Sequence, residues 1–130
     1  QKAIGLKSRT RLHCDLKPRS TAWVIFQAIL PIYCGCIFDR SEPDITFGRS
    51  NHSYNLRRDI KNIYEFSKND IGLCPENTAA ICMGNDPLHL TNFSLEKTRI
   101  KVKGHSVMMG YLDESKNESS FKKEGLFISV

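Results

Sequence analysis

Several segments of the chain alternate apolar and polar residues with a period of two, which is the pattern of a half-buried β-strand. The clearest is TRIKVKG at 98–104, where Ile100 and Val102 alternate with cationic residues. Prolines and glycines separate the segments, as expected of turns between short strands. The pattern predicts an all-β fold, an antiparallel flattened barrel or sandwich. The other strand candidates are TRLHC at 10–14, DITFG at 44–48, HSVMMGY at 105–111 and GLFISV at 125–130.

Two further segments have apolar patterns of a different kind. The run AWVIFQAIL at 22–30 is too short to span a bilayer and ends at Pro31, so we predict a buried strand or strand pair there. In SYNLRRDIKNIYEF at 53–66, the apolar residues fit one face of a helix and one face of a strand about equally well. This is the one place where the pattern allows a short helix.

The length of 130 residues corresponds to a single domain. We expect one compact unit, in which residues 1–33 form N-terminal strands or a linker and residues 34–130 form the β domain proper. The chain begins with Gln1 and ends on the apolar alternation GLFISV, which predicts that it is an excerpt of a longer protein.

The charge balance is mildly basic, with 19 Lys and Arg against 14 Asp and Glu. The densest basic stretch, residues 98–105, alternates its cations with apolar residues instead of clustering them. Nucleic-acid binding needs a clustered basic face. The sequence therefore predicts solvated strand faces and no nucleic-acid partner.

The five cysteines are Cys14, Cys34, Cys36, Cys74 and Cys82. Their C-x-C and C-x7-C spacings do not match the closely spaced pairs of a zinc site, and the four histidines are scattered. A redox C-x-x-C motif is absent, and although His13 precedes Cys14, nothing in the sequence points to the base and oxyanion site that a nucleophilic cysteine needs. We expect no metal, no cofactor and no catalysis.

Three N-glycosylation sequons accompany the cysteines, at Asn51, Asn92 and Asn117. Together they favour an extracellular or lumenal location in the secretory or endosomal pathway, where cysteines form disulfide bonds. All five cysteines are then candidates for disulfides, and the odd one needs a partner outside this chain. Any membrane attachment would lie in parts of the protein outside this chain.

The segment IKNIYEFSKNDIG followed by LCPENTAAICM resembles the middle of a mannose-6-phosphate receptor homology domain. The resemblance covers roughly residues 34–130 and depends more on order and spacing than on any single motif. It is carried by CIFDRSEPDITFG at 36–48, Asn62-Ile63-Tyr64, Cys74, the run from Ala79 to Met83, the strand from Val107 to Tyr111, Leu112-Asp113-Glu114 and the run from Leu126 to Val130.

This resemblance implies a lectin-like module in which Glu114 and Tyr111 contact the sugar. The glutamine and arginine of the family's sugar site have no counterpart here, and Tyr64 and Val130 stand where the family has cysteines. The resemblance therefore implies a degenerate repeat that binds glycan weakly or not at all. Its partners would be proteins or neighbouring domains of a larger receptor.

Two other families share parts of the sequence. PENTAAIC and KTRIKVKG resemble strands of an immunoglobulin-like domain engaged in protein recognition, although Cys14 and Trp23 are closer than usual and Ala80 replaces the tyrosine of that fold. KGHSVMMGYLDESKNESSFKKEG at 103–125 resembles the stretch before the hinge of adenylate-forming acyl-CoA ligases, without a glycine-rich phosphate loop. Oxidised cysteines would oppose a cytosolic ligase.

Overall fold

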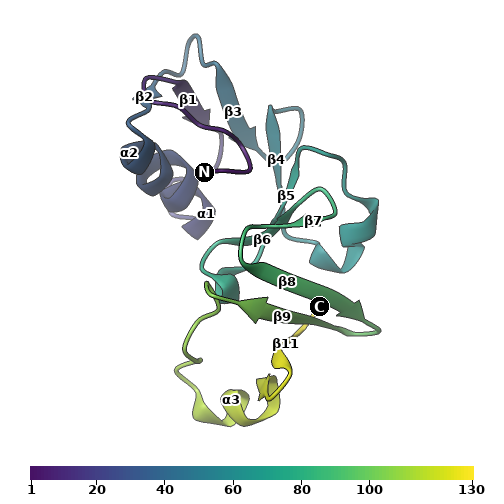
Figure 1. Ribbon diagram of the computed structural model, residues 1–130. Helices are drawn as coiled ribbons and strands as arrows, with labels where there is room; N and C mark the ends of the chain where they lie inside the picture. Colours follow the sequence, from purple (N-terminus) through teal and green to yellow (C-terminus); the bar gives the residue numbers. More distant parts are fainter.

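Two β-sheets lie one beyond the other along the long axis of the molecule in the computed structural model, which describes residues 1–130 (Figure 1). The first sheet contains seven strands, β1 (Arg11–Cys14), β2 (Ile37–Phe38), β3 (Ile45–Gly48), β4 (Tyr54–Arg57), β5 (Asp70–Leu73), β6 (Ala80–Met83) and β7 (Asp86–Pro87). The second contains four, β8 (Thr91–Glu96), β9 (Arg99–Gly104), β10 (Phe121–Lys122) and β11 (Gly125–Ser129). The helical elements are α1 (Thr21–Trp23), η1 (Val24–Ile29), α2 (Leu30–Cys34), η2 (Ile60–Glu65), η3 (Pro75–Asn77) and α3 (Glu114–Ser120).

The seven-stranded sheet is mixed, with the order β2-β1-β3-β4-β5-β6-β7. Its first five strands pair in parallel, and only β5–β6 and β6–β7 are antiparallel. The second sheet, β10-β11-β9-β8, is antiparallel throughout. The prediction of a sheet-rich fold is confirmed, but the antiparallel pairing predicted for it holds only in the second sheet and at β5–β6 and β6–β7. Helices connect and cover strands, one sheet is mixed, and no barrel closes.

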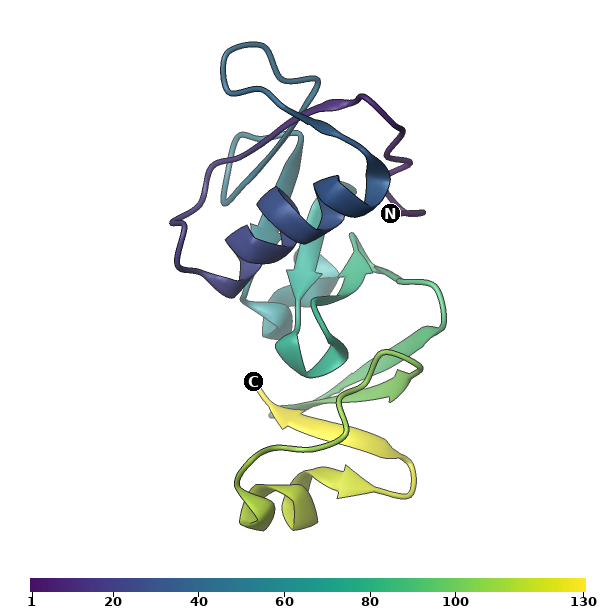
Figure 2. The same cartoon turned by 90° about the vertical axis from the view of Figure 1, so that its left-hand side faces the viewer.

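The segment 22–30 is helical, so the predicted buried strand is wrong. A continuous helix formed by α1, η1 and α2 crosses one side of the first sheet (Figure 2). Ser20 caps its start by accepting a hydrogen bond from the Trp23 N–H, with 3.1 Å between oxygen and nitrogen. Gly35 ends it in the left-handed region, at φ 71°. The stretch before Pro31 is π-helical, and in it the Leu30 N–H bonds to the Ile25 oxygen.

The ambiguous segment 53–66 contains both structures, strand β4 followed by the 3-10 helix η2. The segment 105–111 forms no strand, contrary to the prediction. Its Met108 N–H bonds to the Glu76 oxygen at 2.8 Å instead of joining a strand ladder, and Met109 is fully exposed. By contrast, β1, β3, β9 and β11 form where alternation predicted them.

Two apolar cores lie on either side of the β5–β6 pair. Ile71 and Ala80 belong to the core beneath the helix, whereas Ile81 and Cys82 belong to the core that joins the two sheets. The first core comprises Leu6, Leu12, Cys14, Ala22, Phe26, Phe47, Leu56, Ile71 and Ala80. The second comprises Ile60, Ile63, Phe66, Cys74, Ile81, Cys82, Ile100, Val102, Leu126 and Ile128.

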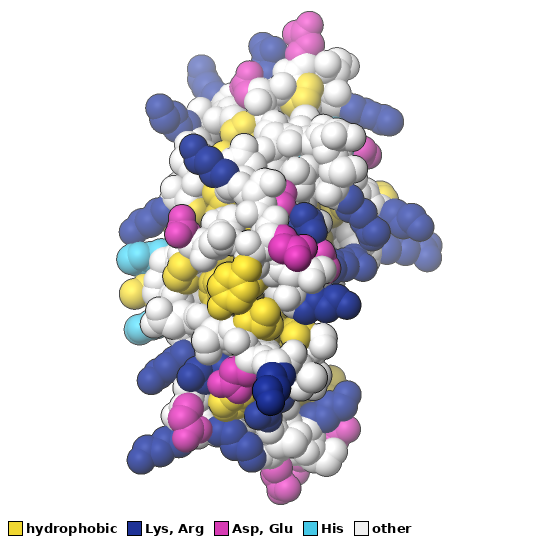
Figure 3. Space-filling view, turned by 90° about the vertical axis from the view of Figure 1, so that its right-hand side faces the viewer, with side chains coloured by type: hydrophobic (Ala, Val, Ile, Leu, Met, Phe, Trp, Pro, Cys, Tyr) yellow, Lys and Arg dark blue, Asp and Glu magenta, His cyan; other side chains and the backbone are white.

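The segment 1–33 shares a sheet with the rest of the chain, because its strand β1 lies between β2 and β3. None of the helices has the length and apolar character needed to cross a bilayer. All lysine and arginine side chains are exposed except Arg57 and Lys101, which are half-buried. On the face shown in Figure 3, hydrophobic side chains gather near the centre, with cationic and acidic side chains around them.

Candidate functional site

A pocket of about 500 Å³ opens where four segments of the chain meet. They are the start of α1, the turn 58–61 that leads into η2, the segment 73–79 around η3, and the end of β11 at 128–130. Each segment follows or precedes a strand that is anchored in one of the two cores, so the pocket has a rigid frame. Half of the lining residues are hydrophobic, which makes one wall apolar.

Two cations stand at the edge of this pocket, Arg58 and Lys61, and neither forms an ion pair within the chain. The nearby Asp59 does not neutralise them, because its carboxylate is bound by both Nε and Nη2 of Arg57. That hydrogen bonding lowers the pKa of Asp59 to about 2. The positive charge of Arg58 and Lys61 therefore remains free for an anionic ligand.

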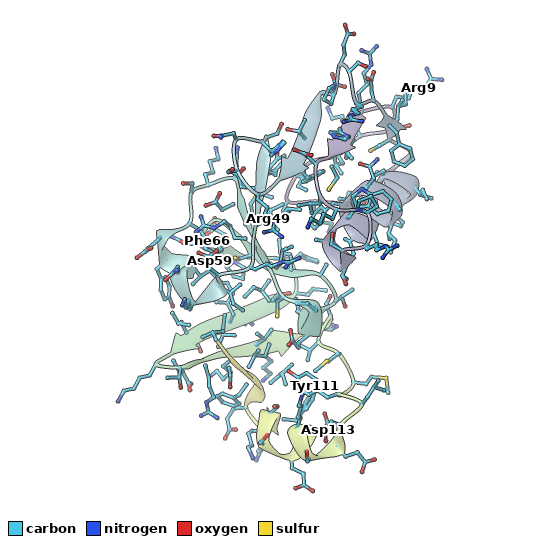
Figure 4. All side chains as sticks on the ribbon, turned by 180° about the vertical axis from the view of Figure 1, so that it is seen from behind. Arg9, Arg49, Asp59, Phe66, Tyr111 and Asp113 are labelled. Carbon is cyan, nitrogen blue, oxygen red and sulfur yellow. The ribbon has the colours of Figure 1, made fainter.

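Arg57 fixes the turn that carries these two cations. Its Nη1 lies 3.0 Å from Oδ2 of Asp70, which is 4% exposed, and its guanidinium stacks 4.7 Å from the centre of the Phe66 ring. Asp70 also accepts a hydrogen bond from the Ser67 N–H at 3.0 Å. Figure 4 shows Asp59 and Phe66 close together beside η2. Because a buried carboxylate must be paired, this cluster locks β4, β5 and the turn together.

Glu76 connects the pocket to the loop 105–113. The hydroxyl of Tyr111 donates to Oε1 of Glu76 across 3.3 Å, and the Glu76 backbone oxygen accepts the Met108 N–H. Burial and the negative charge of Glu76 raise the pKa of Tyr111 to about 12, so its hydroxyl stays protonated. The Sγ atom of Cys74 also lies 3.6 Å from Oε2 of Glu76. The carboxylate is therefore an oriented acceptor in the pocket wall.

Asn117 holds the same loop from the other side. Its Oδ1 accepts the Tyr111 N–H at 2.7 Å, and its Nδ2 donates to the Tyr111 oxygen at 3.1 Å. Glu114 is exposed in the first turn of α3 and makes no hydrogen bond to Tyr111. Of the two residues expected to contact sugar, only Tyr111 therefore points toward a pocket residue, and the structure does not join it with Glu114.

All five cysteines are free thiols, so the expected disulfide bonds are absent from the structure. Cys14, Cys74 and Cys82 are buried in the two cores, and Cys34 and Cys36 are half-buried around the end of the helix. Burial raises the pKa of Cys14 to about 11, of Cys74 to about 12 and of Cys82 to about 11. These three thiols are packing residues, because a protonated thiol is a poor nucleophile and metal ligand.

The three sequon asparagines lie in different surroundings. Asn51 and Asn92 are exposed, the first in the left-handed region at φ 59° and the second on β8. Asn117 is half-buried in α3, with its amide engaged by Tyr111. No group of three or more His, Cys, Asp or Glu side chains is arranged to hold a metal ion.

Sequence reasoning missed the pocket residues Arg58, Lys61 and Glu76. The two cations lie in the segment 53–66, whose pattern fits helix and strand equally, and Glu76 lies in a short polar turn between Cys74 and Cys82 with no motif around it. Comparisons with protein-family models, with curated proteins and with solved structures found no match. An apolar wall, two free cations and one oriented carboxylate suit an amphipathic ligand with an anionic group and hydrogen-bond donors.

Proposed function

We propose that this chain forms part of the ligand site of an adenylate-forming acyl-CoA ligase, with the pocket between the sheets binding an acyl adenylate or a ligand of the same chemistry. The segment 103–125, which resembles such ligases, runs from the end of β9 through α3 and β10 to the start of β11. Tyr111, within that segment, is hydrogen-bonded to Glu76 in the pocket wall. The segment that resembles the ligases therefore contacts the pocket through the hydrogen bond between Tyr111 and Glu76.

The observation that carries the proposal is the composition of the pocket wall. Arg58 and Lys61 are cations without carboxylate partners, and they suit the phosphate of an adenylate. Ile25, Ile60 and Ala79 supply an apolar surface for an acyl group on the same pocket. The Glu76 carboxylate accepts hydrogen bonds from hydroxyl or amino groups.

Within this chain the residues bind and orient the ligand and do not react with it. Cys74 is the only thiol in the pocket lining, and burial keeps it protonated by raising its pKa to about 12. The role proposed for these pocket residues is thus to position the ligand.

The fold and the thiols support this proposal over the receptor and immunoglobulin interpretations. Both rivals are antiparallel β modules stabilised by disulfides, whereas here β1 to β5 pair in parallel and the cysteines are free. A secretory receptor repeat remains the alternative hypothesis. Occupied glycans at Asn51 and Asn92 on the protein from its native source would favour it.

Isothermal titration calorimetry with a non-hydrolysable acyl-sulfamoyl adenosine tests the proposal. We expect binding to the wild-type chain, weakened about tenfold by Lys61→Gln, which corresponds to about 1.4 kcal/mol. Ala79→Phe fills the apolar side of the pocket and should weaken binding at least as much. Lys97→Gln, on the exposed β8–β9 turn, is the matched control and should leave binding unchanged. Absence of binding, or equal binding by folded Lys61→Gln and wild type, would refute the proposal.

A further inference from the structure

We propose that the chain has a second ligand site, a basic cleft that binds a small molecule carrying two or more phosphate groups. The cleft has a volume of about 910 Å³ and is formed by the loops that follow three parallel strands. Residues 15–20 follow β1, residues 49–52 follow β3, and Arg58 follows β4. In parallel sheets, ligands bind at the carboxyl ends of the strands, and these are the ends that border the cleft.

Positive charge is concentrated in this cleft without a matching number of carboxylates. Lys17, Arg19, Arg49 and Arg58 line it, and none of them forms an ion pair. Asp15 is the one acidic residue of the lining. Its Oδ2 lies 3.5 Å from Nε2 of His52 and so is already directed to a local partner.

The chemistry of the lining selects an anion over an apolar ligand. Apart from Leu16 and Pro18, every lining residue is polar or charged. Four neighbouring cations repel one another, and a multiply charged anion relieves that repulsion while it forms charge-assisted hydrogen bonds. A guanidinium can donate two parallel hydrogen bonds to two oxygens of one phosphate. Three arginines and a lysine therefore suit a ligand with more than one phosphate group.

The loops that carry the cations are held in place before any ligand arrives. The Asp15 N–H bonds to the Phe47 oxygen at 2.7 Å, which ties the loop after β1 to the end of β3. On the loop after β3, the Ser53 hydroxyl accepts the Thr46 N–H at 3.0 Å, and the Thr46 hydroxyl accepts the Ser53 N–H at 3.1 Å. Such preorganisation lowers the entropic cost of binding.

Gly48 at the end of β3 makes room for His52, which lines the cleft. A Cβ atom at this position would overlap the imidazole of His52, so glycine allows the ring to lie directly on the strand end. Arg49 follows immediately, and Figure 4 shows its side chain beside the end of the sheet, well separated from Arg9. The His52 ring and the Arg49 side chain therefore both belong to the lining of the cleft.

This site is separate from the proposed ligase-type pocket, with which it shares only Arg58 among its lining residues. The test therefore leaves Arg58 unchanged and uses Lys17 and Arg49. Calorimetric titration with inorganic pyrophosphate should show binding to the wild-type chain that weakens as salt is raised. The double variant Lys17→Gln/Arg49→Gln should bind at least about tenfold more weakly.

Arg9→Gln is the matched control, because Arg9 is exposed and lies outside the cleft. It should bind pyrophosphate like the wild type, and so should Ala79→Phe, because Ala79 also lies outside the cleft. Arg49→Lys keeps the charge and should recover part of the affinity lost in Arg49→Gln. Circular dichroism checks that each variant is folded.

A second arm separates free phosphates from lipid headgroups. Flotation with vesicles containing phosphatidic acid should retain no more wild-type chain than vesicles of neutral lipid. Retention on the anionic vesicles without pyrophosphate binding would overturn the small-molecule assignment. Pyrophosphate binding that Lys17→Gln/Arg49→Gln and Arg9→Gln reduce equally, or no binding to either probe, would refute the site itself.

Discussion

Single residues fasten the loop 105–113 to the pocket, and Asn117 is the clearest case. Both polar atoms of its amide bond to the backbone of Tyr111, whose hydroxyl reaches Glu76. An asparagine that the sequence offered as a glycan acceptor is therefore a structural residue. The sequon motif could not reveal this, because it describes three successive residues and says nothing about what the amide contacts.

Replacement of Asn117 by alanine should lower the free energy of unfolding by about 1–3 kcal/mol, because two backbone groups of a half-buried loop lose their partners. Urea denaturation measures the change. Ser119→Ala is the control on the same helix, since the exposed Ser119 hydroxyl bonds only to the Lys116 oxygen. An Asn117→Ala effect no larger than that of Ser119→Ala would contradict the structural role.

Asp59 should make stability depend on pH in the acid range. Hydrogen bonds from Arg57 lower its pKa in the folded chain to about 2, whereas in the unfolded chain the pKa is about 3.9. Its contribution is therefore complete above about pH 4 and is lost as the pH falls toward about 2. Solvent screens this partly exposed pair, so we expect a contribution below about 1 kcal/mol.

The measurement is the unfolding free energy of wild type and Asp59→Asn at several pH values. The difference between the two should shrink between about pH 4 and about pH 2. Asp86→Asn, on exposed β7 and without an ion pair, serves as the control. A difference that stays constant over this range would show that the Arg57–Asp59 pair does not form in solution.

At the scale of elements, alternation predicted β9 and β11 correctly, because each of these strands buries one face. In β9, Ile100 and Val102 are fully buried while their neighbours are not, and β11 buries Leu126 and Ile128 in the same way. The sequence pattern did not predict the helix 21–34, because its segment is apolar on both faces. Such a run shows neither the 3.6-residue period of a half-buried helix nor the two-residue period of a half-buried strand. The residues at its ends are typical helix boundaries, because Ser20 is an N-cap and Gly35 a left-handed C-cap.

The cap of this helix can be tested directly. Ser20→Ala removes the acceptor for the Trp23 N–H and should lower the unfolding free energy by about 1 kcal/mol. Ser20→Thr keeps a hydroxyl acceptor and should remain close to the wild type. Thermal unfolding followed by circular dichroism compares the three proteins. Equal stability of Ser20→Ala and wild type would mean that the helix starts elsewhere.

At the scale of the whole molecule, the sequence predicted a sheet-rich chain but not its topology. Parallel pairing of β1 with β3 joins residues that are more than thirty positions apart, and no local pattern encodes such a pairing. The five cysteines predicted disulfide bonds, whereas the structure contains them as free thiols. Cys14, Cys74 and Cys82 occupy core positions like small apolar residues, and spacing alone cannot separate a buried thiol from a disulfide partner.

The same topology explains why the candidate sites escaped prediction. Both are assembled from loops that are distant in sequence, and each loop alone looks like solvated surface. Arg49 and Lys17 come together only because β1 and β3 are neighbours in the sheet. The sequence held the residues of each site but not their proximity.

Thiol accessibility provides a test at this scale. With an aromatic disulfide reagent, we expect Cys34 and Cys36 to react quickly in the native protein, because they are half-buried, and the three buried thiols to react slowly. In denaturant all five should react without prior reduction. Detection of fewer than five thiols until a reductant is added would restore the disulfide hypothesis.

The β5–β6 pair is the partition between the two apolar cores, and this position gives it a distinct dynamic role. An amide in these strands reaches solvent only when both adjoining cores loosen, whereas the edge strands β2 and β10 need only local fraying. In a hydrogen–deuterium exchange experiment, the backbone amides of β5 and β6 should therefore exchange last. Because residues 73–79, which join β5 to β6, line the first pocket, that pocket should keep its shape as long as this pair stays closed.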